Sequence, residues 1–176
     1  MNASAAECVH GCGYGYINGA LASAGLFDPS TNNGIWLAGD YTGEYPFFRI
    51  RSVNDDGSAQ AATALALVRL FTLIVDGRLV SEMPSQQMSS LLGKAVAAHE
   101  VFIDRASDLD FAVTLTKVGL GPLKTGASVW SETSLITHQS GRKFVVAWQN
   151  FTATNQDGFD PIGHVVRDTI DAYLGV

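Results

Sequence analysis

The ten residues GPLKTGASVW, from Gly121 to Trp130, place a lysine, a threonine and a glycine in a stretch that otherwise reads as a β-strand. A cation next to a hydroxyl group can hold a carboxylate through charge-assisted hydrogen bonds, and a glycine lets a ligand approach the backbone. Lys124, Thr125 and Gly126 are therefore candidates for the wall of an active site. The alternative is an ordinary strand edge with one solvated lysine.

Two cysteines form a second group of reactive side chains, because Cys8 and Cys12 flank His10 in CVHGC. A zinc-type site needs four ligands, or three and a water molecule, and the other histidines are isolated in the sequence. We therefore expect no metal and no cofactor, and two small buried thiols. A disulfide across so short a segment would demand a particular geometry.

The composition limits the classes of function. Apolar residues make up 47% of the 176 residues and charged residues 16%, which predicts a globular chain. The net charge of -6, without a basic stripe, argues against nucleic-acid binding. No apolar run reaches the roughly 20 residues of a membrane span. The first residues lack a signal-peptide pattern, which predicts a cytoplasmic protein as written, or a periplasmic or secreted one if an upstream signal has been lost.

Helical patterns fill most of the first two thirds of the chain. Residues 14–25 predict a short helix that ends at Gly25, and a segment rich in turn formers follows it. Residues 58–77 predict the clearest helix, with Ser58 as its N-cap and Gly77 at its end.

Two shorter helices are expected before the chemistry of the chain changes. They span residues 84–95, with Pro84 in the first turn, and residues 97–106. Four β-rich runs come next: FAVTLTKVGLG, PLKTGASVW, SETSLITHQ and KFVVAWQNF. Gly141 allows a tight hairpin between the last two runs.

An amphipathic helix closes the chain over residues 160–176. Its apolar side is predicted to contain Ile162, Val165, Val166, Thr169, Ile170 and Tyr173. A helical cluster, then an antiparallel sheet, then a covering helix together predict an α+β fold.

This order of elements resembles the C-terminal two thirds of the bacterial serine β-lactamase and penicillin-binding protein family, and its class A-type members in particular. SAQAATALALVRLFTLIVDGRLVSEMPSQQMSSLL is similar to the helix pair that follows the active-site loop. LKTGASVWSETSLITHQSGRKFVVAWQNF is similar to the Lys-Thr/Ser-Gly strand and its two successors. The resemblance covers about residues 58–176, with a weaker match back to Cys12.

The resemblance implies one partial β-lactamase-like domain over residues 1–176. Residues 12–106 would form its mainly helical part and residues 111–176 its sheet and C-terminal helix, while the N-terminal strands and the nucleophile helix are missing. Because the family's sheet includes those strands, we expect an uncovered strand edge. Such an edge pairs with other chains, so we expect a homodimer or a complex with a missing N-terminal piece.

The family also suggests roles for the KTG triplet, because its strand forms one wall of the cleft. Lys124 would supply positive potential for a substrate carboxylate and assist proton transfer, and Thr125 would donate to that carboxylate. Gly126 would let the substrate backbone come close. The implied ligand is a carboxylate-bearing small molecule or peptide.

The family's second motif, Ser-x-Asn, lies at the start of a helix and shuttles protons. One register places Cys12, Gly13 and Tyr14 at the Ser-Asp-Asn positions, which differ in all three residues. Another register offers Tyr16-Ile17-Asn18 as a Tyr-x-Asn triplet, the form of class C-type relatives. Cys12, Tyr16 and Asn18 are therefore candidate site residues.

The family's nucleophile belongs to Ser-x-x-Lys at a helix N-terminus. The one such sequence here, Ser140 to Lys143, falls in the predicted hairpin turn, and we interpret it as chance. Glu44 and Asn54 are loose candidates for the deacylating glutamate and the loop asparagine. These departures predict a degenerate active site.

Three functions remain open at this point. The chain is part of an acyl-serine hydrolase that acts on a β-lactam or a peptide-like amide or ester, if an absent Ser-x-x-Lys segment completes it. Alternatively, it is a catalytically inactive protein that keeps the fold for binding or as a scaffold. Thiol chemistry at Cys12 is the third hypothesis, and it would require a lowered thiol pKa.

Overall fold

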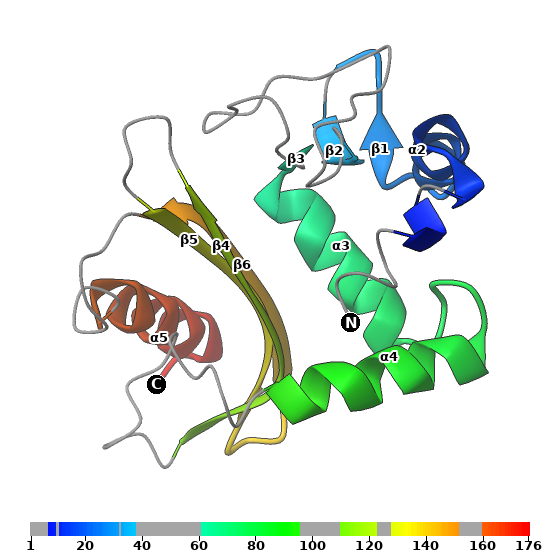
Figure 1. Cartoon of the computed structure of the whole chain (residues 1–176). Helices are drawn as coiled ribbons and strands as arrows, with labels where there is room; N and C mark the ends of the chain where they lie inside the picture. The colour runs from blue at the N-terminus through cyan, green and yellow to red at the C-terminus, as the bar shows by residue number, and fades with distance from the viewer. Residues whose placement is uncertain are drawn as a thin grey trace. The chain divides into compact units, whose positions relative to one another are not determined.

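The computed structural model describes residues 7–9, 11–31, 33–37, 61–95, 110–122, 128–151 and 160–176. The elements within them are α2 (Tyr14–Ser23), β1 (Phe27–Asp28), β2 (Asn33–Trp36), β3 (Ala61–Ala62), α3 (Ala64–Val75), α4 (Glu82–Ala95), β4 (Phe111–Pro122), β5 (Ser128–His138), β6 (Lys143–Phe151) and α5 (Asp160–Leu174) (Figure 1). Helices and antiparallel strand pairs thus occur together, which confirms the α+β prediction. None of the helices in these ranges is long and apolar enough to span a membrane.

The chain divides into two compact units, with α3 contributing to both. The first unit contains the described residues up to Arg69, with Gly121 and Pro122, and its strands follow the order β1-β2-β3. The second unit contains the rest of the described residues, and its strands follow the order β4-β5-β6.

Helices α2 and α3 end in the same way, at a glycine with positive φ. Gly25 has φ 69°, its N–H donates to the carbonyl of Ala22, and the N–H of Leu26 donates to that of Leu21. At the end of α3, Gly77 has φ 71° and the N–H of Arg78 donates to the carbonyl of Leu73. This is the Schellman pattern, in which a left-handed glycine satisfies the last carbonyls of the helix. The predicted ends of both helices are confirmed.

The predicted start of the long helix is wrong by several residues. Ala61 and Ala62 lie in β3, where they pair with Trp36 and Ile35 of β2, so the helix begins only at Ala64. The hydroxyl of Thr63 accepts a hydrogen bond from the N–H of Ala66 at 3.3 Å and serves as the N-cap. Ser58 lies outside the described residues.

Helix α4 confirms the prediction for residues 84–95, with Pro84 in its first turn, where the missing N–H of proline costs little. Residues 97–106 lie outside the described ranges.

The predicted boundary between the runs PLKTGASVW and SETSLITHQ is wrong. PLKTGASVW and SETSLITHQ were expected as separate runs, but β5 continues from Ser128 to His138 without a break at Trp130. Its pairing with β6 shifts register between Trp130 and Glu132, and such a bulge interrupts the alternation of side chains that marks a strand in the sequence. The hairpin between β5 and β6 is confirmed, with Gly141 at φ 80° in its turn.

The core of the second unit lies between the sheet and α5, which covers one face of the strands (Figure 1). Ile136 of β5 and Ile170 of α5 are buried at its centre. Around them pack Phe111, Val113, Phe144, Val146, Trp148, Ile162, Val166 and Leu174. This arrangement confirms the covering C-terminal helix.

The predicted apolar side of α5 is only partly right. Val165 and Tyr173 are 65% and 71% exposed, and Thr169 is exposed as well. The buried stripe instead follows Ile162, Val166 and Ile170 at a spacing of four residues. Val165, Thr169 and Tyr173 each come one residue before a member of the stripe that packs on the sheet, and a step of one residue turns a helical side chain by about 100°, away from the sheet.

Candidate functional site

The predicted cleft-wall triplet, Lys124 to Gly126, lies outside the described residues. It falls between Pro122, the last residue of β4, and Ser128, the first residue of β5. The roles proposed for these residues therefore stay predictions.

A second lysine–x–glycine triplet, Lys117-Val118-Gly119, lies within β4. Lys117 is exposed, and its ammonium group donates to the carbonyl of Val118. A Cβ atom at position 119 would lie 2.7 Å from Oγ of Ser131, so glycine allows the hydroxyl of the neighbouring strand to come close. In the sequence this triplet is part of an ordinary β-rich run, although its lysine–x–glycine spacing matches that of KTG.

Asn18 joins α2 to the residue that follows β2. Its Nδ2 donates to the carbonyl of Leu37 at 3.1 Å, and its Oδ1 accepts from the N–H of Leu37 at 2.9 Å. The nitrogen and the oxygen of the Asn18 amide are therefore both bonded to the backbone, so Asn18 has a structural role here. Tyr16, two residues earlier on α2, is 73% exposed.

Both cysteines are exposed and free, so the prediction that they are buried is wrong. The Cys8 side chain raises the pKa of the Cys12 thiol, first as its hydrogen-bond partner and then through the charge it carries when ionised. A raised pKa leaves less thiolate at neutral pH, and the thiolate is the nucleophilic form. This direction disfavours Cys12 as a nucleophile. No group of three or more metal-binding side chains occurs within the described ranges.

Three polar side chains are buried together between β4 and β5. Thr116 is fully buried and donates to Oε1 of Glu132 at 2.6 Å, and Ser134 donates to the same oxygen at 2.8 Å. Glu132 is only 1% exposed, and its Oε2 has no hydrogen-bond partner among the described residues. Burial raises the pKa of the Glu132 carboxyl, and the two hydroxyl groups offset only part of that effect. This cluster was not predicted from the sequence, where its visible signal is a glutamate within a β-rich run.

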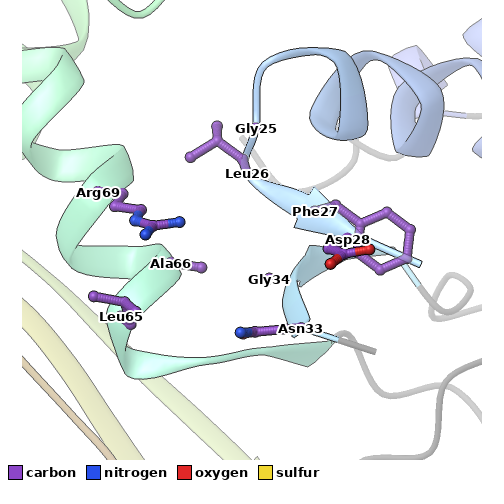
Figure 2. A pocket seen from close by; sticks show the side chains of 9 residues that line it. All are labelled: Gly25, Leu26, Phe27, Asp28, Asn33, Gly34, Leu65, Ala66 and Arg69. Atoms are coloured by element: carbon purple, nitrogen blue, oxygen red, sulfur yellow. The ribbon is translucent and has the colours of Figure 1, made fainter. Parts of the chain in front are cut away.

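A small cavity lies in the first unit, between α3 and the β1–β2 strands. Its volume is about 130 Å³, and it is lined by Gly25, Leu26, Phe27, Asp28, Asn33, Gly34, Leu65, Ala66 and Arg69. Figure 2 shows the Arg69 side chain extending from α3 toward β1. Sites for drug-sized ligands occupy about 300–1,000 Å³, so this cavity is too small to hold one.

Asp28 and Asn33, two polar residues that line the cavity, accept hydrogen bonds from nearby side chains and backbone. The hydroxyl and N–H of Ser30 donate to Asp28 at 2.6 and 2.9 Å, and the hydroxyl of Thr31 donates at 2.8 Å. These bonds, the one from the Ser30 hydroxyl foremost, lower the pKa of Asp28 and keep it ionised. Asn33 accepts a hydrogen bond from the hydroxyl of Thr63 at 3.0 Å.

The chance Ser-x-x-Lys sequence lies in the turn between β5 and β6, as expected. The Oγ of Ser140 is 2.9 Å from Nδ1 of His138, and the N–H of Ser140 donates to the same nitrogen at 3.1 Å. The Ser140 hydroxyl also accepts from the N–H of Arg142 at 3.4 Å. These contacts close the hairpin turn, and they do not pair Ser140 with Lys143.

The elements and their order define a β-lactamase-like fold. The structure is similar to that of a β-lactamase from Sphaerobacter thermophilus, with a TM-score of 0.61 and 18% identity. A class A β-lactamase from Bacteroides cellulosilyticus gives a TM-score of 0.62 at 17% identity. A class D β-lactamase from Fusobacterium nucleatum subsp. polymorphum gives a TM-score of 0.50 at 11% identity.

These alignments cover nearly all of this chain but only part of each β-lactamase chain. They include 99%, 91% and 96% of this chain but only 58%, 55% and 57% of the respective β-lactamase chains. The chain thus spans a little over half of the length of each. No protein-family model and no curated protein matches the sequence. At such low identities the likeness establishes the fold alone.

Proposed function

We propose that this chain supplies the carboxylate-binding wall of a β-lactamase-related serine hydrolase-like protein. The complete protein would hydrolyse a β-lactam or a peptide-like amide or ester through a further segment with Ser-x-x-Lys at a helix N-terminus, since the Ser-x-x-Lys of this sequence lies in a hairpin turn. The observation that carries the proposal is the order of β4, β5, β6 and α5 within a β-lactamase-like fold.

Two lysines compete for the role of the cleft-wall cation. Lys124 belongs to a KTG triplet, which has both the hydroxyl and the glycine that carboxylate binding calls for. Lys117 has only valine and glycine after it, so it would act as a cation without a neighbouring hydroxyl.

The order of strands favours Lys117. The resemblance places the lysine triplet on a strand with two strands and a terminal helix after it, and β4 is followed by β5, β6 and α5. Lys117 is exposed on β4, where its ammonium group can meet a ligand, whereas Lys124 lies outside the described residues. We therefore assign Lys117 to the cleft wall and treat Lys124 as the alternative.

The chain alone is expected to bind a carboxylate without forming a covalent bond. The hydroxyl of Ser140 is engaged by the hairpin turn, and the raised pKa of Cys12 opposes thiolate formation. A nucleophile and its base would have to come from the missing segment.

An inactive binding or scaffold protein is the second candidate function. It is favoured by Asn18, whose amide is engaged by the backbone of Leu37 and not free to move protons. Under this alternative, no adduct forms even after the missing segment is supplied.

The proposal also predicts a partner for the sheet. β6 is the last strand in the order β4-β5-β6, and no strand of the described residues pairs with its outer edge, which is therefore a candidate edge for pairing. A second copy of this chain or the missing N-terminal piece would cover that edge. A single monomeric species in sedimentation velocity would count against this arrangement.

Titration calorimetry with benzylpenicillin, followed by intact-mass analysis, tests the function. We expect saturable binding and no added mass. Lys117→Ala should weaken binding about 10-fold or more, since a charge-assisted hydrogen bond contributes about 1.5–3 kcal/mol. Lys124→Ala should have a smaller effect, and Lys94→Ala, at an exposed lysine of α4, should have none.

Each contrary result has a definite meaning. A larger loss for Lys124→Ala would return the cleft-wall role to the KTG triplet. A stoichiometric adduct would contradict the absence of a nucleophile, and the absence of saturable binding would refute the carboxylate-binding wall.

A further inference from the structure

Cys8 and Cys12 lie one helical turn apart on the same face. Residues 7–9 and 11–12 are helical, and the N–H of Gly13 donates to the carbonyl of Val9 at 2.8 Å, which is the i to i−4 bond of an α-helix. Side chains four residues apart on a helix are neighbours. Both thiols are exposed and therefore accessible from solvent.

The two thiols act on each other. The side chain of Cys8 is a hydrogen-bond partner of the Cys12 thiol, so the two sulfur atoms lie close together. A metal ion that bonds to both sulfurs can displace the protons of the two thiols.

The geometry points to a site for one thiophilic metal ion, and we propose that Cys8 and Cys12 bind a two-coordinate ion of the Cu(I) type. Thiolates are soft ligands that favour Cu(I) and zinc. Zinc would need four ligands, and the described residues contain no group of three or more. A monovalent ion that accepts two sulfurs in a linear arrangement needs nothing beyond this pair.

The binding step involves no change of oxidation state. Two S–H bonds are lost and two Cu–S bonds form, while two protons pass to the solvent. The product is a dithiolate complex with one negative charge, exposed to water on the helix surface. Occupancy of the site thus depends on the concentration of free Cu(I) and on the pH, and it requires no oxidant.

Anaerobic titration with Cu(I) in competition with bicinchoninate tests the site, with the thiols kept reduced by a phosphine. We expect one Cu(I) per chain, and calorimetry in two buffers should show about two protons released per ion. Cys8→Ala and Cys12→Ala should each weaken the affinity at least tenfold. Both side chains are exposed, so the far-ultraviolet circular dichroism of the variants should match that of the parent chain.

The matched control moves one thiol without changing their number. The double variant E7C/C8A keeps two cysteines, but they are five residues apart and lie on different helix faces. It should bind no better than a single-cysteine variant. Equal affinity in the parent chain and in E7C/C8A would overturn the proposal, as would a stoichiometry of one Cu(I) per two chains.

Discussion

The two units of the molecule use polar side chains in opposite ways. In the first unit, Asn18 holds the backbone of Leu37 and Thr63 caps α3, so polar groups at the partly open surface fix the path of the chain. In the second unit, Thr116, Glu132 and Ser134 are buried and bond to one another between strands that pack on α5. Polar side chains in the first unit therefore fix the backbone, whereas those in the second unit form a buried network that includes one acid.

The largest expected effect comes from Gly34, which tests the dependence of the first unit on backbone contacts. Gly34 has φ 127°, and a Cβ atom there would lie 2.3 Å from the carbonyl oxygen of Leu26 and 2.5 Å from Cα of Phe27. Gly34→Ala should destabilise the first unit by about 3–5 kcal/mol, because backbone atoms cannot move aside and φ is strained. Hydrogen exchange at the N–H of Ile35, which donates to Leu26, reports the loss of β1–β2 pairing.

Gly15→Ala is the control for that experiment. Gly15 lies within α2 with open space around its Cβ direction, so alanine should stabilise the helix by about 0.5–1 kcal/mol. Unchanged exchange at Ile35 in Gly34→Ala would show that β1 and β2 do not pair in this register.

Glu132 offers the corresponding test in the second unit, with a somewhat smaller effect. Glu132→Ala leaves a cavity and removes the acceptor of two buried hydroxyl groups, which should cost about 2–4 kcal/mol in urea unfolding. Glu132→Gln keeps an oxygen that accepts from Thr116 and Ser134, and its amide resembles a protonated carboxyl. It should change stability by less than about 1 kcal/mol. Equal losses in both variants would mean that the carboxyl group is ionised.

The pH dependence of stability follows from the raised pKa of Glu132. The folded state holds the proton more firmly than the unfolded chain, whose carboxyl titrates near its ordinary value of 4.5. The contribution of Glu132 is therefore complete below that value and is lost as the pH rises through the higher pKa of the folded state. Urea midpoints measured from acidic to alkaline pH should fall more steeply for the parent chain than for Glu132→Gln. Parallel curves would contradict the burial of this acid.

The smallest expected effect concerns Asn18. Asn18→Ala removes two hydrogen bonds to Leu37 and should cost about 1–2 kcal/mol, with loss of exchange protection at the N–H of Leu37. Ser23→Ala is the control, since the Ser23 hydroxyl is exposed and bonds only within its own helix. A loss no greater than that of Ser23→Ala would show that Asn18 does not hold α2 to the strand.

The sequence predicted the elements that rest on local signals. Gly25 and Gly77 marked the ends of two helices because each provides a left-handed residue that few others can provide. Gly141 marked the β5–β6 turn for the same reason. Ser58 was a wrong start for α3, because Ala61 and Ala62 pair with a strand that is distant in sequence and local propensity cannot reveal that pairing.

The candidate site could be predicted less well than the fold. KTG is visible in the sequence, but its three residues lie outside the described ranges, so its place in a site stays a prediction. The engagement of Asn18 by Leu37 and the burial of Glu132 both depend on contacts between segments. Such contacts fix whether a polar residue is structural or available for chemistry, and residue type alone does not.

The close approach at Gly34 has a consequence for how this chain can diverge over evolutionary time. Every other L-amino acid carries a Cβ atom, so no substitution at this position escapes the collision with Leu26, whatever its polarity or size. This position should therefore stay glycine for as long as the hairpin is inherited, whatever changes occur around it. The pair formed by Gly25 at the end of α2 and Gly34 in β2 is thus a marker for distant relatives. It should help to recognise them where overall identity is too low to do so.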